Sequence, residues 1–377
     1  MTRFCNWPFE FAWIRGGGRV SICCRMKNGG YTDGNLNEIG FEDAINTDTA
    51  QAMRRSILDG TYGYCSPDCP KLFGEHNMSE NTKYQQILEN RSLTVTEIRH
   101  IVLGYDRSCS LACPSCRKEV FTPVGEELVR LKKYHDMVLE KIPAPEEMNV
   151  SGSGDAIGSV TARMFLRNFG SYPKFGNTRL MLATNATLLT PKAWASIEAS
   201  HHNIAVISVS IDGAREETYR KIRTGDFQRL KENMSFLCSQ RRHYTTTSKI
   251  VNSFTKIRDQ REQATTNRAV ARIGWRPCRP FRLEVNFIVQ KGNYTEMGEM
   301  VDLCRHWQVD RLHFIPIRFW SSGAYTKEEM AEQQVFGSTH RLLGNFLEYL
   351  KDPRLDDAIV DLQGRLAALK RQCQATG

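Results

Sequence analysis

The sequence predicts an α/β protein built on a parallel sheet and preceded by a small cysteine-rich module. From residue 96 onward, short apolar runs alternate with longer helical patterns, and strands separated by helices indicate a parallel sheet because parallel neighbours need crossover connections. Eight of the twelve cysteines lie in the first 116 residues. No apolar run reaches the ~18 residues of a membrane helix, and none follows the N-terminus, so we expect neither a membrane span nor a signal peptide.

Six runs have the length and composition of buried strands. They are residues 97–104, 147–152, 179–184, 204–211, 282–289 and 311–317. Apolar residues at helical spacing mark stretches at 124–142, 158–170, 191–200, 227–238 and 295–307. Parallel α/β proteins carry their chemistry at the carboxyl ends of the strands, so the residues that follow each strand are the first candidates for a site.

The chain divides into regions by composition. The composition predicts four regions: a hairpin-plus-helix module at residues 1–72, a polar linker at 73–95, the parallel α/β domain at 96–320 and C-terminal helices at 321–377. An insertion at 239–280 has ten Lys and Arg against two acidic residues, which accounts for +8 of the net charge of +9. A single basic segment of this kind is typical of a solvated insertion rather than of a nucleic-acid groove.

The first strand is followed by three cysteines in a C-x3-C-x2-C spacing, Cys109, Cys113 and Cys116. Three thiolates on one loop can bind three corners of a [4Fe–4S] cluster and leave the fourth iron without a protein ligand. A zinc site would need a fourth Cys or His, which the surrounding loop does not supply.

This triplet resembles that of the radical S-adenosylmethionine (radical SAM) enzymes. The resemblance implies a partial (β/α)6 barrel whose catalytic cluster is bound by Cys109, Cys113 and Cys116. In that family the open iron binds SAM, and one electron cleaves SAM to a 5′-deoxyadenosyl radical that takes hydrogen from the substrate. One departure is Ser115, where many members have an aromatic residue near the adenine.

The resemblance continues after the next three strands. The segment 152–155 (GSGD) is similar to the family's Gly-Gly-Glu element, which holds the SAM amino group, and the segment 184–187 (TNAT) is similar to its Thr-Asn-Gly-Thr stretch. The resemblance also implies that Ser210, at the end of the fourth predicted strand, lies near the SAM carboxylate or ribose. The SAM-binding positions implied are Gly152, Ser153, Gly154, Asp155, Asn185, Ser210, Asp212 and Arg223. Asn286 and residues 290–293 are further candidates to line the pocket.

The N-terminal cysteines form a second set. Cys5 and Cys23 flank Gly18 in a C-x12-G-x4-C spacing, and Cys65 and Cys69 form a C-x3-C pair. This pattern looks like the SPASM/twitch module, which implies an auxiliary [4Fe–4S] cluster with these four ligands. Cys24 is the rival of Cys23, and structural zinc is the alternative metal. The module usually follows the barrel; here it precedes it, and we expect the linker to bring it over the open carboxyl-end mouth of the sheet.

These patterns predict a radical SAM enzyme that acts on a peptide or carbohydrate-type substrate by oxidation, epimerisation or cross-linking. A reductase or a flavodoxin- or ferredoxin-type protein would donate the electron. Clustered thiols in a chain without signs of secretion indicate a reducing, cytoplasmic setting. The alternative is a non-catalytic adaptor that holds zinc or iron–sulfur in both cysteine sets. We expect no membrane or nucleic-acid partner.

Overall fold

The computed structural model describes residues 4–27, 33–66, 69, 82–256, 281–319 and 323–375. Within them one continuous sheet of ten strands has the order β10-β9-β8-β7-β6-β5-β4-β1-β2-β3. The neighbours from β10 to β1 pair in parallel, whereas β1, β2 and β3 pair in antiparallel fashion. The predicted α/β class with a mostly parallel sheet is therefore confirmed.

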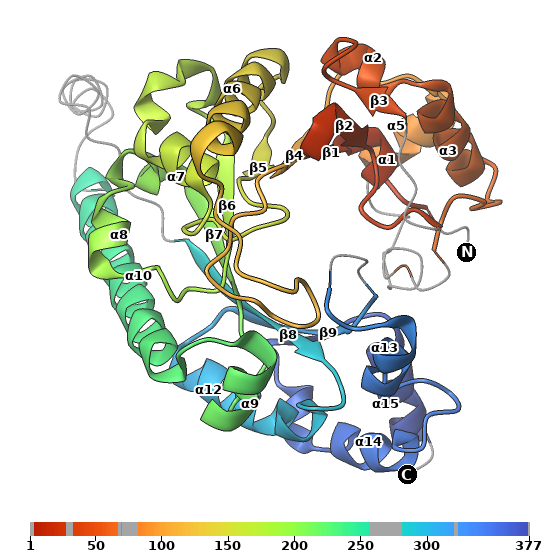
Figure 1. Ribbon diagram of the computed structural model, residues 1–377, viewed down its shortest axis with the longest axis vertical. Coiled ribbons are helices and arrows are strands. Elements are labelled where there is room, and N and C mark those ends of the chain that lie inside the picture. The colour runs from red at the N-terminus through yellow and green to blue at the C-terminus, as the bar shows by residue number, and fades with distance from the viewer. Residues whose placement is uncertain are drawn as a thin grey trace.

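All six predicted strands are present and lie side by side in chain order. They are β4 (His100–Gly104), β5 (Glu147–Asn149), β6 (Arg179–Thr184), β7 (Ile204–Ser210), β8 (Arg282–Val289) and β9 (Arg311–Pro316). Helices connect them along the outer side of the curved sheet (Figure 1). These helices are α6 (Gly125–Lys141), α7 (Val160–Arg167), α8 (Pro191–Ala195), α9 (Glu216–Arg223), α10 (Phe227–Lys256) and α12 (Met297–His306).

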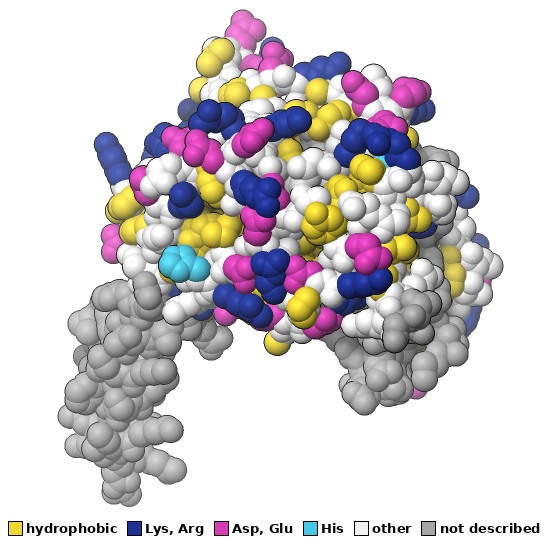
Figure 2. Space-filling view, turned by 90° about the horizontal axis from the view of Figure 1, so that it is seen from below, with side chains coloured by type: hydrophobic (Ala, Val, Ile, Leu, Met, Phe, Trp, Pro, Cys, Tyr) yellow, Lys and Arg dark blue, Asp and Glu magenta, His cyan; other side chains and the backbone are white. Residues whose placement is uncertain are grey.

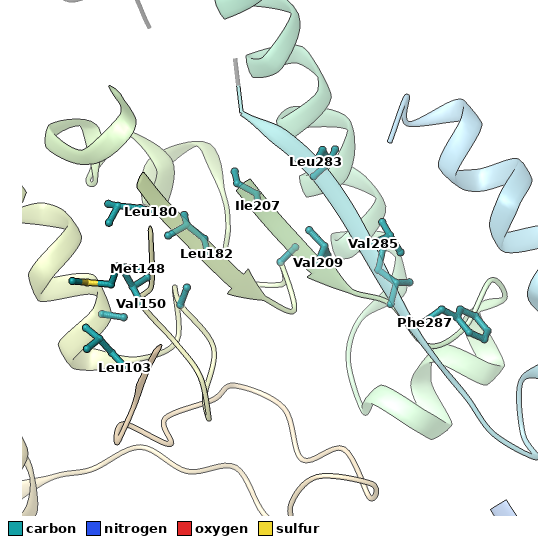
Figure 3. Close-up of a cluster of buried hydrophobic side chains, with 14 of the residues drawn as sticks. Leu103, Met148, Val150, Leu180, Leu182, Ile207, Val209, Leu283, Val285 and Phe287 are labelled. Atoms are coloured by element: carbon teal, nitrogen blue, oxygen red, sulfur yellow. The ribbon is translucent and has the colours of Figure 1, made fainter. Parts of the chain in front are cut away.

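The strands have two unlike faces. Buried residues alternate with partly exposed ones along β6, β8 and β9, as expected for strands with only one face covered. Figure 3 shows ten of the buried side chains on the face that packs against the helices; they are Leu103, Met148, Val150, Leu180, Leu182, Ile207, Val209, Leu283, Val285 and Phe287. The half-exposed residues line the opposite, concave face.

The N-terminal module is part of the same sheet. Its strands are β1 (Phe11–Arg15), β2 (Arg19–Ser21) and β3 (Gly34–Asn35), and its helices are α1 (Trp7–Glu10), α2 (Phe41–Ile45) and α3 (Asp48–Leu58). Strand β1 pairs with β4 over five residues, from Phe11 opposite His100 to Arg15 opposite Gly104. The predicted linker contains helix α5 (Thr82–Asn90) in its described part.

The C-terminal region contains helices, as predicted, and one strand that was not. Helices α13 (Lys327–Gln333), α14 (Leu343–Leu350) and α15 (Arg365–Ala375) flank β10 (Val360–Leu362), which pairs in parallel with β9. The run of parallel strands therefore extends beyond the six predicted for the barrel by one strand at each end, β10 next to β9 and β1 next to β4.

No helix in the described part of the chain combines the length and the hydropathy that crossing a membrane requires. On the face of the molecule seen from below, Lys and Arg side chains are interspersed with Asp and Glu (Figure 2). This mixture agrees with the near neutrality of the sequence outside the basic insertion.

Candidate active site and auxiliary cysteine site

The cysteine triplet lies on the loop that leaves the carboxyl end of β4. Cys109 and Cys113 are buried, whereas Cys116 is exposed. The loop closes on itself: the backbone N–H of Cys109 donates to the carbonyl of Phe121 at 3.0 Å, and that of Cys116 donates to the carbonyl of Cys113 at 2.8 Å. Local backbone bonds thus present the three thiols from a single compact loop.

Asp106 ties the start of this loop to helix α7. One carboxylate oxygen accepts hydrogen bonds from the N–H and hydroxyl of Ser108, and the other accepts bonds from Ser159 and Thr161 at the helix start. Burial by itself would raise the pKa of Asp106, but these hydrogen bonds outweigh it and hold the pKa below its ordinary value. In the sequence, only its place directly after a strand marks this residue, which was not among the predicted site residues.

Arg117 fixes the other end of the loop and was also missed. Its guanidinium donates to the carbonyl of Arg107 at 2.6 Å and to that of Ser153 at 2.9 Å, and it approaches Cys116 Sγ to 3.6 Å. Only 7% of Arg117 is exposed. A buried arginine next to the third cysteine therefore links the cysteine loop to the segment after β5.

The glycines after β5 accommodate the chain itself. A Cβ on Gly154 would come within 2.4 Å of the carbonyl oxygen of Ser108, in the cysteine loop, and one on Gly152 within 2.3 Å of Val102 Cγ1. The close approach expected for a ligand is thus made by the cysteine loop and by β4. Ser153 contributes its carbonyl to Arg117.

Asp155, which is 1% exposed, uses its carboxylate to join two loops. One oxygen accepts from Thr184 Oγ1 at 2.7 Å and from the N–H of Asn185 at 2.5 Å. The other accepts from the N–H groups of Ile157 at 3.1 Å and Gly158 at 2.6 Å. Both oxygens are therefore occupied by donors of this chain.

Asn185, after β6, lies against the first cysteine. Its amide nitrogen is 3.6 Å from Cys109 Sγ and 3.3 Å from Ser110 Oγ. Its amide oxygen accepts from the N–H and hydroxyl of Thr187. The segment that follows β6 thus places an amide donor, Asn185, beside the thiol of Cys109.

Asp212 and Arg223 form an ion pair of 3.0 Å with side chains 1% and 12% exposed. The other carboxylate oxygen of Asp212 accepts from the N–H of Ile288. Helix α9 ends against the cysteine loop: Cys113 Sγ is 3.5 Å from the carbonyl of Arg223, and Thr224, at a positive φ of 57°, accepts from the N–H of Ala112. The structure thus brings the pair next to Cys113.

Ser210 is half-buried at the end of β7 and faces the concave side, opposite Asn286 in register. In segment 290–293, Gln290 is 1% exposed and Asn293 donates to the carbonyls of Asp212 and Ile288. The chain after β9 reaches the cysteine loop, where the N–H of Ala324 donates to the carbonyl of Pro114 at 2.7 Å.

The buried thiols need positive neighbours to ionise. Burial raises the pKa of Cys109 and of Cys113, while the charges of Arg117 and Arg223 act in the opposite direction. Burial would lower the pKa of Arg223, but Cys113 and Asp212 raise it above its ordinary value. The site therefore places thiols that can bind a metal next to the buried cations Arg117 and Arg223. Positive charges of this kind stabilise the thiolate form that binds metal.

Two buried donors beside Cys113 have no hydrogen-bond partner in the described part of the chain. They are Nε of Arg223 and the hydroxyl of Tyr219, whose pKa is raised by burial. Buried polar groups are nearly always hydrogen-bonded, so unpaired donors of this kind indicate a bound group. Three thiols from one loop and two such donors fit an iron–sulfur cluster with an anionic ligand beside it.

The N-terminal cysteines also converge. An isolated bridge pairs Met26 with Cys65, and the N–H of Cys69 donates to the carbonyl of Ser66. Cys5 and Cys69 share a small apolar cluster with Phe4, Phe9 and Ile57, against which Cys65 packs.

The pKa shifts of two of these thiols include contributions from other cysteines of the module. Burial raises the pKa of Cys23, with further contributions from Cys24, Cys5 and Cys69. Burial together with Cys69 raises the pKa of Cys65 to about 11. Cys23 is buried and Cys24 exposed, which favours Cys23 as the ligand. Among the described residues, no three His, Cys, Asp or Glu side chains form a group that could hold a single metal ion.

The module does not lie over the carboxyl-end mouth, so this expectation was wrong. The residues of α1 precede β1, and the N–H of Arg99, just before β4, donates to the carbonyl of Glu10. Trp7 and Phe11 help to line a cavity of about 150 Å³ whose other walls include His100 at the amino end of β4. Because β1 pairs directly with β4, the N-terminal cysteines lie at the amino-end edge of the sheet.

A family model for the SPASM iron–sulfur cluster-binding domain matches residues 5–70. This match confirms the resemblance of the N-terminal cysteines to a SPASM module. No curated protein matches the chain.

Solved structures match only distantly. SuiB of Streptococcus suis is 14% identical with a TM-score of 0.40, and the match covers 84% of this chain and 61% of SuiB. SuiB bound to precursor peptide SuiA is 13% identical with a TM-score of 0.42, and the match covers 86% of this chain and 64% of that protein. The structure of anSMEcpe with bound AdoMet is 13% identical with a TM-score of 0.40, and the match covers 70% of this chain and 63% of that protein. The chain thus spans less than two thirds of these proteins.

Proposed function

We propose that this protein is a radical SAM enzyme with an N-terminal auxiliary iron–sulfur site. The observation that carries the proposal is the loop after β4, which bears three cysteines and lies beside two buried donors, Arg223 Nε and the Tyr219 hydroxyl, that have no hydrogen-bond partner among the described residues. When bound at Cys109, Cys113 and Cys116, the reduced cluster supplies one electron that cleaves SAM to methionine and a 5′-deoxyadenosyl radical, which takes a hydrogen atom from the substrate.

The surrounding residues divide into two roles. Arg223, Tyr219 and Ser210 lie where a carboxylate or ribose can accept their hydrogen bonds, and we assign them to SAM. Gly152, Ser153, Gly154 and Asp155 position the loops, because their space and hydrogen bonds are used within the chain. Asn185 and Asp212 orient Cys109 and Arg223 in the same way.

The second site, at Cys5, Cys23, Cys65 and Cys69, is assigned an auxiliary [4Fe–4S] cluster. The SPASM match over these residues supports this assignment, and so do the pKa values of Cys23 and Cys65, which burial and neighbouring cysteines raise. A peptide or carbohydrate-type substrate and a flavodoxin- or ferredoxin-type electron donor complete the proposal. The eleven described cysteines are all free thiols, which fits a reducing cytoplasm.

Anaerobic reconstitution tests the function. The protein with iron and sulfide, reduced by dithionite in the presence of SAM, should release methionine and 5′-deoxyadenosine in equal amounts. Cys113→Ala should abolish this release, whereas the control Cys373→Ala, which changes a half-buried thiol near the C-terminus, should retain it. A colourless, zinc-loaded protein that leaves SAM intact would overturn the proposal in favour of an adaptor.

A further inference from the structure

The concave face of the sheet carries a row of polar side chains that starts at Ser210, in the proposed SAM site, and continues beyond that site. Ser210 on β7 stands opposite Asn286 on β8, Asn286 opposite His313 on β9, and His313 opposite Asp361 on β10. Residues in register on parallel strands point to the same face, and neighbouring strands lie about 4.8 Å apart. The row therefore begins beside Ser210 and extends roughly 14 Å to the additional strand β10.

Three charged groups hold the far half of this row together. His313 Nδ1 is 2.8 Å from Asp361 Oδ2, and its Nε2 is 3.4 Å from Glu284 Oε2. Gln363 also donates to Asp361, at 3.2 Å. Both nitrogens of His313 thus face carboxylates, so the imidazole fixes the orientation of Asp361 and is itself unavailable to a ligand.

The atoms left over in the row are acceptors. The amide nitrogen of Asn286 donates to Ser208 Oγ at 2.8 Å, which leaves its amide oxygen without a donor among the described residues. Asp361 Oδ1 likewise has no donor there, and 42% of this side chain is exposed. A surface that offers a carboxylate and an amide oxygen suits a group that brings its own N–H or O–H bonds.

We propose that Asn286 and Asp361 are two separate contact points of a subsite that binds hydrogen-bond-donating groups of the substrate, hydroxyls or an ammonium, and that His313, which lies between them in register, is a positioning residue for Asp361. The proposal rests on the proposed function only in naming the bound group as part of the substrate. The strand register supports this placement, because Ser210, which we assign to SAM, is on the strand next to that of Asn286. A substrate group held at Asn286 would lie next to SAM, and one held at Asp361 would lie two strands further away.

The protonation of His313 gives a readout. Burial would lower the pKa of His313, but the bonds to Asp361 and Glu284 raise it to about 9. The other charged groups around the cluster are Arg282, which pairs with Glu284 at 3.2 Å, and Arg311, which acts on both carboxylates. A cation that binds Asp361 should therefore lower the pKa of His313.

The experiment titrates the reconstituted full-length protein, labelled with ¹⁵N-histidine, by NMR. The chain has nine histidines, and His313→Gln identifies the signal. Methylammonium tests the ammonium arm, methyl glucoside tests the hydroxyl arm, and tetramethylammonium, which has no N–H, controls for ionic strength. We expect methylammonium to lower the pKa of His313, or methyl glucoside to shift its ¹⁵N signals without lowering the pKa, and tetramethylammonium to do neither.

Asp361→Asn should abolish the methylammonium effect. The matched control is Asp356→Asn, which breaks an ion pair of 3.0 Å with Lys370 elsewhere in the same C-terminal region and should leave both responses intact. If Asp361→Asn does not fold, Asn286→Val should reduce the response to either probe. A His313 signal that ignores both donors, or responds equally in Asp361→Asn, overturns the subsite. Because this readout needs no SAM cleavage, it is independent of failure of the proposed function.

Discussion

Asp155 shows how both oxygens of a buried carboxylate can be used by donors within the chain. Its two carboxylate oxygens accept four hydrogen bonds, from Thr184 and Asn185 after β6 and from Ile157 and Gly158 before α7. An acid after the second strand was predicted to meet the SAM ammonium group. The geometry favours instead a role in holding together the loops beneath the cysteines.

Replacing Asp155 should therefore act on stability first. Asp155→Ala leaves four donors unpaired, three of them buried. One buried unpaired group costs about 1–3 kcal/mol, so we expect a loss of at least ~2 kcal/mol in the free energy of unfolding. Asp155→Asn should lose less, because its amide oxygen can still accept from two donors. Anaerobic urea unfolding measures both. An Asp155→Ala protein of unchanged stability with weakened SAM binding would restore the ammonium contact.

A second prediction at this scale concerns His313 and pH. Its pKa of about 9 in the folded protein lies above the unfolded value of 6.5, so its contacts favour folding fully below pH 6.5 and lose this contribution as the pH rises through 9. The stability difference between the unaltered protein and His313→Gln should therefore shrink between these two pH values. Urea unfolding at several pH values measures it, and a difference that grows with pH would contradict the assignment.

Among single residues, the sequence predicted which types of side chain gather at the strand ends but not how they pair. Asp212 and Arg223 were named separately, and the structure joins them. Asp106 and Arg117 were missed because an isolated acid or arginine in a loop has no spacing signal; their importance comes from burial, which only the fold creates.

At the scale of elements, helix α10 continues into the first part of the basic insertion. The predicted helix at 227–238 extends to Lys256, and residues 257–280 of the insertion lie outside the described residues. Arg241 and the N–H of Leu283 both bind the same oxygen of Asp310, at 2.6 and 2.8 Å. The two ends of the insertion therefore meet at one carboxylate.

This closeness predicts where the insertion can be removed. Replacing residues 242–279 by a short Gly/Ser linker should leave folding nearly unchanged, since the ends need little linker and loop closure costs little per residue. A deletion that begins at 239 also removes Arg241 and should lower the melting temperature relative to the first. Differential scanning calorimetry compares the two. If both shortened proteins aggregate, the insertion contributes to the core.

The elements that sequence reasoning missed are those with the weakest patterns. Strands β6 and β8 agree residue for residue with their predictions because both have long apolar alternation. Helix α9 buries only Tyr219 and Ile222, and β10 has three residues, so neither has enough periodicity to be recognised. Strand β1 was hidden within the cysteine-rich module, since its partner β4 lies 85 residues further on in the chain.

At the scale of the whole molecule, the β1–β4 pairing makes one body of the module and the parallel sheet. Trp13 on β1 lies over Gly104 and Gly152, and a Cβ on Gly104 would come within 1.9 Å of Trp13 Nε1. A chain shortened to residues 96–377 would expose this edge of β4 and an apolar surface, and exposed edges promote aggregation. We expect the shortened protein to be insoluble. If it is instead soluble and monomeric in size-exclusion chromatography, the module is dispensable for folding.

The pairing also separates the two cysteine sets. The loop with Cys109, Cys113 and Cys116 leaves the carboxyl end of β4, while the N-terminal cysteines lie at the amino-end edge beside β1. A strand of five residues spans about 17 Å at ~3.3 Å per residue. At this separation no thiol can serve both sites, so each set should load with iron independently of the other.

The iron content of two variants tests this independence and its limit. Two cubane clusters hold about eight irons per chain, so the triple change of Cys109, Cys113 and Cys116 to Ala should leave about four irons in a folded protein. Cys5→Ala with Cys23→Ala should also lose about half the iron, but it removes the proposed auxiliary cluster, which would anchor the module that supplies the partner strand of β4. This second variant should therefore also unfold at a lower urea concentration than the triple variant. About four irons in the unaltered protein, or equal stability of the two variants, would show that the N-terminal site holds no cluster that supports the sheet.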